Sequence, residues 1–217
     1  MIRLYDYWRS SAAYRVRIAL ALKNVAYEPV AINLVAGDHR GAEYRARHPQ
    51  GLVPALDIHG VTLTQSLAII DYLDTAFPDP PLIPSDPLPR ARVLAQALVI
   101  AADIHPVNNL RLLNRLTEQF GADQAAKDDW YRHWVAEGFT ALEAMAGEGV
   151  GDGPFLGGPF LGGNTPNLAD ICLVPQMYNA RRFALPLDAY PRLVGADAAA
   201  QALPAFAAAH PDRVKPA

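Results

Sequence analysis

Two adjacent serines, Ser10 and Ser11, follow a short predicted strand and begin a predicted helix, and they are the first candidates for chemistry. Serine is a preferred helix cap, because its oxygen accepts hydrogen bonds from the free N–H groups of the first turn. The same N–H groups, with the positive end of the helix dipole, can hold an anion. Three arginines, Arg9, Arg15 and Arg17, surround this turn. The turn therefore predicts either an ordinary capped helix or a site for an anionic ligand.

The elements that must position this turn are read from the residues on either side of it. Residues 2–7 favour β-structure and predict a short strand. Residues 12–23 are good helix formers with an apolar face at helical spacing. Residues 27–32 alternate as a second strand. Because a right-handed helical crossover joins the two strands, they are expected to be parallel.

The next segment completes a sheet. A short helix is expected over residues 42–47, where the following His-Pro pair disfavours further helix. Two alternating runs at residues 55–58 and 61–64 flank a His-Gly pair, which is a hairpin signal. A helix over residues 67–77 follows. The order β-α-β-α-β-β-α predicts a mixed four-stranded sheet.

Six prolines between residues 78 and 89 cannot continue a helix or a central strand. They predict a linker, residues 81–89, between an α/β domain of residues 1–80 and an all-helical domain of residues 90–217. The helices expected in the second domain cover residues 90–116, 124–146, 167–183, 192–200 and 204–209.

Four smaller features lie in the second domain. A glycine-rich hexapeptide written twice over residues 153–163 predicts a surface loop. Asn167 and Asp170 have the spacing of a capping box. Cys172 lies in an apolar run and is expected to be a buried structural residue. Residues 211–217 are expected to be frayed.

Composition limits the class of protein. The chain has 217 residues and a net charge of −3, with no polybasic run, so no nucleic-acid partner is indicated. No apolar run approaches the ~18 residues of a membrane span. The start of the chain does not resemble a signal peptide, and a single cysteine excludes an internal disulfide. These features are typical of a cytoplasmic protein. No Cys/His cluster suggests a metal site.

The domain order resembles that of cytosolic glutathione transferases, which join a thioredoxin-like α/β domain to an all-α domain. Six segments narrow the resemblance: Arg9-Ser10-Ser11, residues 15–23, Leu52-Val53-Pro54-Ala55-Leu56, residues 65–70, residues 104–111 and residues 168–176. These segments are similar to those of the zeta class, and the resemblance covers nearly the whole chain. The zeta class includes maleylacetoacetate isomerases and maleylpyruvate isomerases, so the resemblance implies a glutathione-dependent cis–trans isomerase. The family is usually homodimeric.

One position departs from the class. The zeta motif is usually Ser-Ser-Cys, and the third position here is Ala12. The attacking sulfur in the implied reaction belongs to glutathione, so we expect the reaction to tolerate this change. Some maleylpyruvate isomerases also lack the cysteine, which keeps that substrate as a close alternative to maleylacetoacetate.

The resemblance implies roles for residues around glutathione. Ser10 is the favoured donor to the sulfur, with Ser11 and Arg15 close by, and Tyr7 is a rival donor. The backbone of Val53, before a cis Pro54, would pair with the cysteinyl amide. The other candidate glutathione contacts are Gln65 and Ser66 at the γ-glutamyl end, Gln50 and His39 at the glycine end, and His105 and Asn109.

The second substrate would be a maleyl-type dioxo acid that carries carboxylates. Arginine suits bidentate carboxylate binding, and Arg9, Arg111 and Arg182 are the candidates; each could instead be an ordinary surface charge. Two further hypotheses remain open at this point. The protein could be a broader glutathione transferase or peroxidase, or a transferase fold that binds ligands without catalysis.

Overall fold

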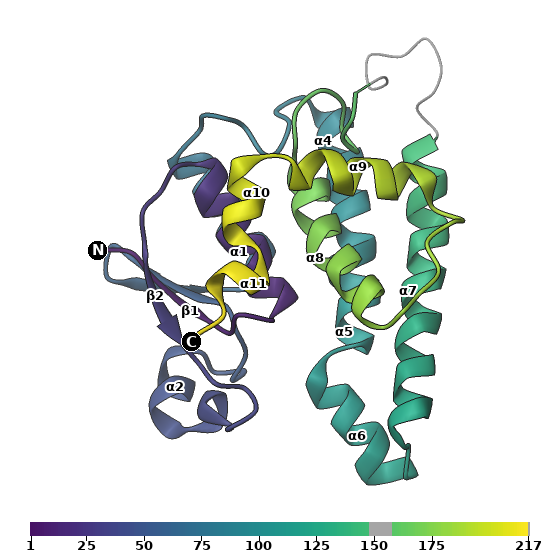
Figure 1. The fold of residues 1–217 in the computed structure, drawn as a ribbon. Coiled ribbons are helices and arrows are strands. Elements are labelled where there is room, and N and C mark those ends of the chain that lie inside the picture. The colour runs from purple at the N-terminus through teal and green to yellow at the C-terminus, as the bar shows by residue number, and fades with distance from the viewer. Residues whose placement is uncertain (148–157, 217) are drawn as a thin grey trace. The chain divides into compact units, whose positions relative to one another are not determined.

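The computed structural model describes residues 1–147 and 158–216. It divides into two compact units (Figure 1). The first unit contains Met1–Leu82 and Ala202–Ala217, and the second contains Ile83–Gln201. The expected domain boundaries, residues 1–80, 81–89 and 90–217, differ from this division chiefly in the last segment, since residues 202–217 pack with the first unit.

The first unit is built on a four-stranded mixed sheet, as predicted. Its strands are β1 (Arg3–Asp6), β2 (Glu28–Ala31), β3 (Ala55–Ile58) and β4 (Val61–Thr64), in the order β2-β1-β3-β4. β1 pairs in parallel with β2 and antiparallel with β3, and β3 pairs antiparallel with β4. The register places Leu4 beside both Pro29 and Leu56. The turn after β1 therefore follows a strand that is held from both sides.

Helices cover this sheet. They are α1 (Ser11–Leu22), the short 3₁₀ helix η1 (Asp38–Arg40), α2 (Ala42–Arg47), α3 (Ser66–Ala76), α10 (Pro204–Ala209) and α11 (Pro211–Val214). α1 packs against both α3 and α10, and α10 lies beside α1 in Figure 1. Ala13, Val16 and Leu20 of α1 are fully buried, which is the burial that their helical spacing predicts. This packing fixes the N-terminus of α1 relative to the sheet.

Two buried cations tie the first unit together. Arg17 Nη1 lies 2.6 Å from Asp6 Oδ2, and the same guanidinium donates to the Trp8 and Ala209 carbonyls. Lys23 Nζ lies 2.6 Å from Asp74 Oδ1 and also donates to the Pro80 carbonyl. Arg17 is therefore a structural residue that joins β1, the following turn and α10.

The expected fraying of the C-terminal tail is wrong for most of its length. Residues Pro211–Val214 form α11, because Pro211 is compatible with the first helical position and His210 Nδ1 accepts from Asp212 N–H at 3.2 Å. Lys215 then lies over the Trp8 ring, with Nζ 5.3 Å from its centroid. Lys215 thus lies against the turn that carries the candidate serines.

The second unit is helical. Its elements are α4 (Pro87–Leu98), the π-helix η2 (Val99–Ile104), α5 (His105–Val107), α6 (Leu110–Phe120), α7 (Gln124–Gly147), α8 (Leu168–Arg182) and α9 (Pro191–Gln201). α8 packs against α4 and α9. Nearly all of α8 is buried, including Cys172 as expected. Of the duplicated hexapeptide, residues 153–157 lie outside the described part, and Phe160 and Gly163 form an isolated bridge.

Two helix predictions in this unit are wrong. The expected linker is shorter, because α4 begins at Pro87 with Asp86 as its cap, and proline is tolerated in the first turn. The expected helix over residues 90–116 is broken, since Pro106 has no N–H to donate and Asn109 caps a new helix. The break separates α4 and η2 from α6, so Asn109 and Arg111 begin a helix instead of lying within one.

The capping box at α8 is confirmed. Asn167 accepts from Ala169 N–H, and Asp170 accepts from the N–H groups of Asn167 and Leu161 at 3.0 and 2.9 Å. Burial raises the pKa of Asp170 to about 6, against the lowering effect of these hydrogen bonds. Asp170 therefore stabilises both the first turn of α8 and the segment before that helix.

Replacing Asp170 with alanine is expected to lower the free energy of unfolding by about 2–3 kcal/mol, because one half of the capping box is lost and the N–H groups of Asn167 and Leu161 lose their acceptor. The loss depends on pH. Folded Asp170 keeps its proton to about pH 6, whereas the unfolded side chain releases it near pH 4. The carboxyl group therefore stabilises the fold most below about pH 4, and the difference between wild type and variant shrinks as pH rises to 6. Urea titrations at several pH values test this, with exposed Asp188→Ala as the control.

Among the helices of residues 1–147 and 158–216, none is both long and apolar enough to span a lipid bilayer.

Candidate active site

The candidate serines lie at the N-terminus of α1. Ser10 is the N-cap, with φ −71° and ψ 121°, and its Oγ accepts from Ala13 N–H at 3.3 Å. Its own N–H donates to the Tyr7 carbonyl at 2.7 Å, which closes the turn after β1. Within the described chain the Ser10 hydroxyl donates to no protein acceptor. Ser10 can therefore cap the helix and still offer its proton to a ligand atom, whereas Ser11 is buried in the first turn.

Aromatic rings hold Arg9 beside this turn. Its guanidinium carbon lies 5.2 Å from the Trp8 ring centroid, and Nη2 donates to Tyr7 Oη at 3.3 Å. Tyr7, the rival thiol donor, is thus an acceptor toward Arg9. The contact between Trp8 and Arg9 was not predicted from the sequence. An aromatic residue directly before an arginine was the one feature of the sequence that could have indicated it.

A second group of predicted residues meets at the start of α3. Arg15 Nη1 donates to Ser66 Oγ at 3.3 Å, and both side chains are buried, which links α1 to α3. Gln65 precedes α3 with a positive φ of 69°. Its Nε2 donates to Gln50 Oε1 at 2.8 Å. The structure therefore brings Gln50, expected at the glycine end of glutathione, together with Gln65, expected at the γ-glutamyl end.

The segment before β3 contains the expected cis peptide bond, between Val53 and Pro54. Both residues are buried, and β3 begins at the next residue. A second cis bond joins Asp79 to Pro80 and was not expected.

His39 lies in η1, in the loop between β2 and α2. Burial lowers the pKa of His39, and the positive charges of Arg40 and Arg45 lower it further. Its Nδ1 is buried and has no hydrogen-bond partner within the described chain. Gly51 comes close to the same loop, since a Cβ on Gly51 would meet the His39 carbonyl oxygen at 2.7 Å. A neutral imidazole with one unused nitrogen can hydrogen-bond a ligand but carries no charge.

The remaining candidates belong to the second unit. His105 begins α5 and is partly buried. Asn109 caps α6 by accepting from Arg111 N–H at 3.1 Å. Arg111 and Arg182 are exposed, and the Arg182 guanidinium lies 4.7 Å from the Phe183 ring centroid.

The three arginines predicted to bind the acid differ from Arg17 and Arg181 in their ion pairs. Arg17 pairs with Asp6, and Arg181 pairs with Asp197 at 2.7 Å. By contrast, Arg9, Arg111 and Arg182 make no ion pair with any residue in the part of the chain that the structure describes. These three guanidinium groups remain able to take a carboxylate from a ligand. The same part of the chain contains no group of His, Cys, Asp and Glu that could hold a metal ion.

Comparisons with known proteins agree with this arrangement. Residues 1–75 match the family model "Glutathione S-transferase, N-terminal domain". The chain is 49% identical over 213 residues to the maleylacetoacetate isomerase of Rhizobium meliloti, covering 98% of this chain and 97% of that protein.

Solved structures agree as well. The holo structure of a maleyl pyruvate isomerase, a bacterial zeta-class glutathione S-transferase, superposes with a TM-score of 0.93 at 44% identity and covers 98% of both chains. A maleylacetoacetate isomerase from Anaeromyxobacter dehalogenans, with dicarboxyethyl glutathione and citrate in its active site, has a TM-score of 0.84 at 42% identity and covers 99% of this chain and 96% of that one. The chain therefore belongs to the zeta class of the glutathione S-transferase family, among the maleylacetoacetate and maleylpyruvate isomerases.

Proposed function

We propose that this protein uses glutathione to isomerise maleylacetoacetate to fumarylacetoacetate, with maleylpyruvate as the alternative substrate. The observation that carries the proposal is the Ser10 hydroxyl, which caps α1 and keeps its proton available at the positive end of that helix. A thiol placed there loses its proton more readily, because the helix N-terminus and an O–H donor both stabilise the thiolate.

Glutathione would be held along the first unit. Ser66 and Gln65 would bind the γ-glutamyl carboxylate, with Arg15 supporting the Ser66 hydroxyl. The Val53 backbone would pair with the cysteinyl amide. Gln50 and His39 would take the glycine end. Ser11 would add its hydroxyl to the environment of the thiolate, and His105 and Asn109 are assigned to glutathione from the second domain.

The acid substrate would be held by arginines that make no ion pair with the described residues. Arg9, Arg111 and Arg182 each offer a fork of N–H donors for a carboxylate or an enolate oxygen. The relative from Anaeromyxobacter dehalogenans supports this class of substrate, because its dicarboxyethyl glutathione has the composition of glutathione added across the double bond of a four-carbon diacid.

The reaction then needs no group besides glutathione. The thiolate adds to one carbon of the cis double bond, and the electron pair moves into the adjacent carbonyl to give an enolate. The former double bond is now single and rotates. The enolate returns its electrons, the C–S bond breaks, and the trans isomer leaves with the thiolate regenerated. Catalysis comes from holding both reactants together and from cations beside the enolate oxygen. Ala12 removes a protein thiol from the site without removing the nucleophile.

Side-by-side turnover of maleylacetoacetate and maleylpyruvate would identify the preferred acid. A broader transferase or peroxidase would instead turn over a chloronitrobenzene or a hydroperoxide faster than maleylacetone, and that result would overturn the proposal. A non-catalytic binding protein would be retained on glutathione resin without isomerising either acid.

Replacing Arg111 with alanine is expected to lower kcat/KM for the maleyl acid by roughly 10- to 100-fold, because one charge-assisted carboxylate contact is lost. The comparison variant is Arg115→Ala, which removes an exposed guanidinium one turn later on α6. Steady-state kinetics with both variants test the assignment. Equal effects at the two positions would show that Arg111 acts only through general charge.

The remaining assignments follow from the family. We propose that residues 1–80 bind glutathione, that the segment before α4 connects the two parts of the chain, and that residues 90–217 contribute to the acid site. A homodimer in the cytoplasm fits the family. Size-exclusion chromatography with light scattering tests the dimer.

A further inference from the structure

Three of the proposed site residues lie in one short stretch of the second unit, where a run of helix is broken. His105 begins α5, Asn109 caps α6, and Arg111 lies in the first turn of α6. In a continuous helix the Val107 carbonyl would accept from the N–H of Arg111, four residues later. Here the Arg111 N–H donates to Asn109 Oδ1 at 3.1 Å instead. The cap that starts α6 therefore takes away the helical donor of Val107.

A tryptophan of another helix replaces that donor. Trp130 lies near the start of α7, and its Nε1 donates to the Val107 carbonyl at 2.9 Å. A partly buried carbonyl that is left without a donor costs free energy. The bond from Trp130 thus stabilises the broken geometry between α5 and α6 against a continuous helix.

A glycine of α7 makes room on the other side of His105. Ile104 is the last residue of the π-helix η2, and α7 packs against η2. A Cβ at Gly138 would lie 2.3 Å from both Cγ1 and Cδ1 of Ile104, a residue that is 1% exposed. Because interiors are closely packed, the Ile104 side chain could not move aside without shifting η2. α7 therefore contacts the chain both before and after His105.

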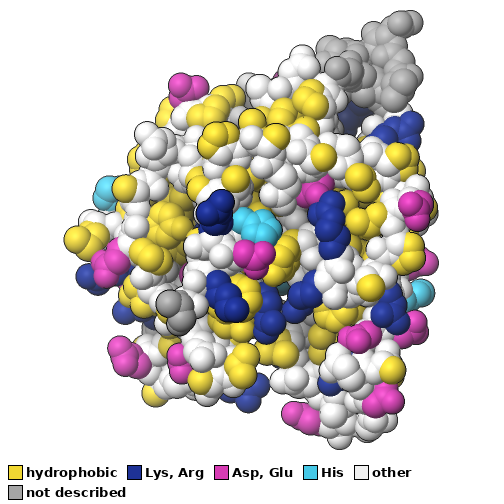
Figure 2. Space-filling view, in the orientation of Figure 1, with side chains coloured by type: hydrophobic (Ala, Val, Ile, Leu, Met, Phe, Trp, Pro, Cys, Tyr) yellow, Lys and Arg dark blue, Asp and Glu magenta, His cyan; other side chains and the backbone are white. Residues whose placement is uncertain are grey.

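The direction of α6 depends on how this helix begins. Every residue of α6 is at least partly exposed, although the helix carries four leucines. Figure 2 shows acidic and basic side chains at the end of the second unit where α6 lies in Figure 1. A helix with so little buried area is held mainly where it joins the rest of the fold. Contacts to the break therefore decide where Arg111 lies.

We propose that Trp130 is a positioning residue for the isomerase: by holding the Val107 carbonyl it fixes the start of α6 and so places Arg111 for a carboxylate of the acid. Gly138 supports the same arrangement by giving Ile104 its place beside α7. Neither Trp130 nor Gly138 is assigned a contact with a reactant. The inference rests on the proposed function, because Trp130 acts on the reaction through Arg111.

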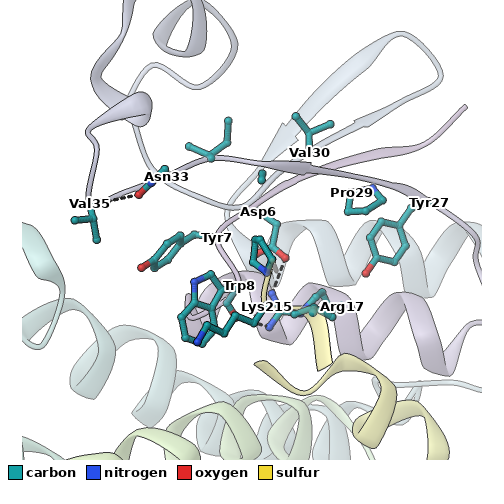
Figure 3. Close-up of a pocket in the computed structure, with 14 residues that line it drawn as sticks. Asp6, Tyr7, Trp8, Arg17, Tyr27, Pro29, Val30, Asn33, Val35 and Lys215 are labelled. Atoms are coloured by element: carbon teal, nitrogen blue, oxygen red, sulfur yellow. Dashed lines mark hydrogen bonds and ion pairs between the residues drawn. The ribbon is translucent and has the colours of Figure 1, made fainter. Parts of the chain in front are cut away.

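Trp130→Phe keeps an aromatic ring and removes the N–H donor. It is expected to lower kcat/KM for the maleyl acid by roughly 5- to 10-fold, which corresponds to one lost hydrogen bond. The control is Trp134→Phe, one turn later on α7, because Trp134 Nε1 has no hydrogen-bond partner among residues 1–147 and 158–216. This control should keep wild-type kinetics. The third tryptophan, Trp8, lies in the first unit beside Lys215 and stays unchanged in both variants (Figure 3).

A double-mutant cycle tests whether Trp130 acts through Arg111. In the Arg111→Ala background, Trp130→Phe should lower kcat/KM by less than about twofold, since the group that Trp130 positions is gone. A merely structural role would give the same factor in both backgrounds. Equal factors, or equal kinetics of Trp130→Phe and Trp134→Phe, would overturn the proposal.

Gly138→Ala tests the second contact. Alanine favours a helix more than glycine does, so a loss of activity would come from the contact with Ile104. We expect kcat/KM to fall, and we expect Ile104→Ala in the same chain to restore it in part by removing the two atoms 2.3 Å away. Gly195→Ala in α9, where nothing lies within 4 Å of the added Cβ, should leave activity unchanged. Absence of rescue would remove the role given to Gly138.

Amide hydrogen exchange gives a readout that does not depend on activity. The N–H groups of Leu112 and Leu113 donate to the Asn109 carbonyl at 2.9 and 3.0 Å. They should exchange faster in Trp130→Phe than in wild type or in Trp134→Phe. Wild-type protein that isomerised neither maleyl acid would overturn the proposed function, whereas unchanged exchange at these two amides would overturn the positioning role of Trp130.

Discussion

Replacing Ser10 with alanine is expected to lower kcat/KM for isomerisation by about 10²- to 10³-fold, the usual cost of removing one donor from a developing or stored negative charge. The hydroxyl is the donor that faces the thiolate in the proposed site, and the structure gives it no other acceptor among the residues described. The pKa of the thiol of bound glutathione should rise at the same time. Ultraviolet absorbance of the thiolate, followed as a function of pH, measures that change directly.

Loss of the cap must be separated from loss of the donor. Ser10 Oγ also accepts from Ala13 N–H, so Ser10→Ala should cost about 1 kcal/mol of stability. Ser10→Gly caps a helix nearly as well as serine but has no hydroxyl, and it should therefore be stable and equally inactive. Ser10→Thr keeps both functions and should retain activity. An unchanged thiol pKa in Ser10→Gly, with a raised one in Tyr7→Phe, would transfer the role to Tyr7.

Replacing Arg17 with leucine is expected to lower the free energy of unfolding by about 3–5 kcal/mol, because Asp6 would keep a buried charge without its partner. Arg17 is 1% exposed and also donates to the Trp8 and Ala209 carbonyls, which would lose their donor. Urea denaturation measures the loss. Arg3→Leu is the matched control, since Arg3 pairs with Glu28 at 2.9 Å with both side chains about half exposed, and such exposed pairs contribute little to stability.

The pH dependence of the Arg17 variant gives a second check. Burial raises the pKa of Asp6, and the charge of Arg17 and its hydrogen bond lower it. Without Arg17 the pKa of Asp6 rises further, so the folded variant binds a proton that the unfolded chain releases. Its deficit relative to wild type should therefore be smaller at pH 4 than at pH 8. Equal losses for Arg17→Leu and Arg3→Leu would contradict a structural role for the buried pair.

Local patterns were enough to predict much of the first unit. The hairpin strands β3 and β4 and the helix α2 have the boundaries that their alternation and breakers predicted, and Ser10 is the cap that its residue type favours. These features depend on residues close together in the chain. The capping box of Asn167 and Asp170 was predictable for the same reason.

Interruptions in the second unit were harder to predict. An apolar pattern continues through residues 90–116. Such a pattern does not distinguish a continuous helix from one that bends, contains a π-helical turn or ends. Pro106 and Asn109 are the signals of the break. The order of residues 211–215 was not predicted, because Lys215 contacts the ring of Trp8, which is far away in the sequence.

Residue types and spacing alone predicted that the Ser10 hydroxyl lies at the N-terminus of the first helix, with Arg9, Arg15 and Arg17 near it in the sequence. Only the folded chain assigns those arginines their different roles, since burial against Asp6 makes Arg17 structural, whereas Arg9 lies against the Trp8 ring and has no carboxylate partner among the described residues. The physical reason is that pairing and desolvation depend on groups brought together from distant parts of the chain. Arg15 and Ser66, 51 positions apart, meet only because α1 and α3 pack together.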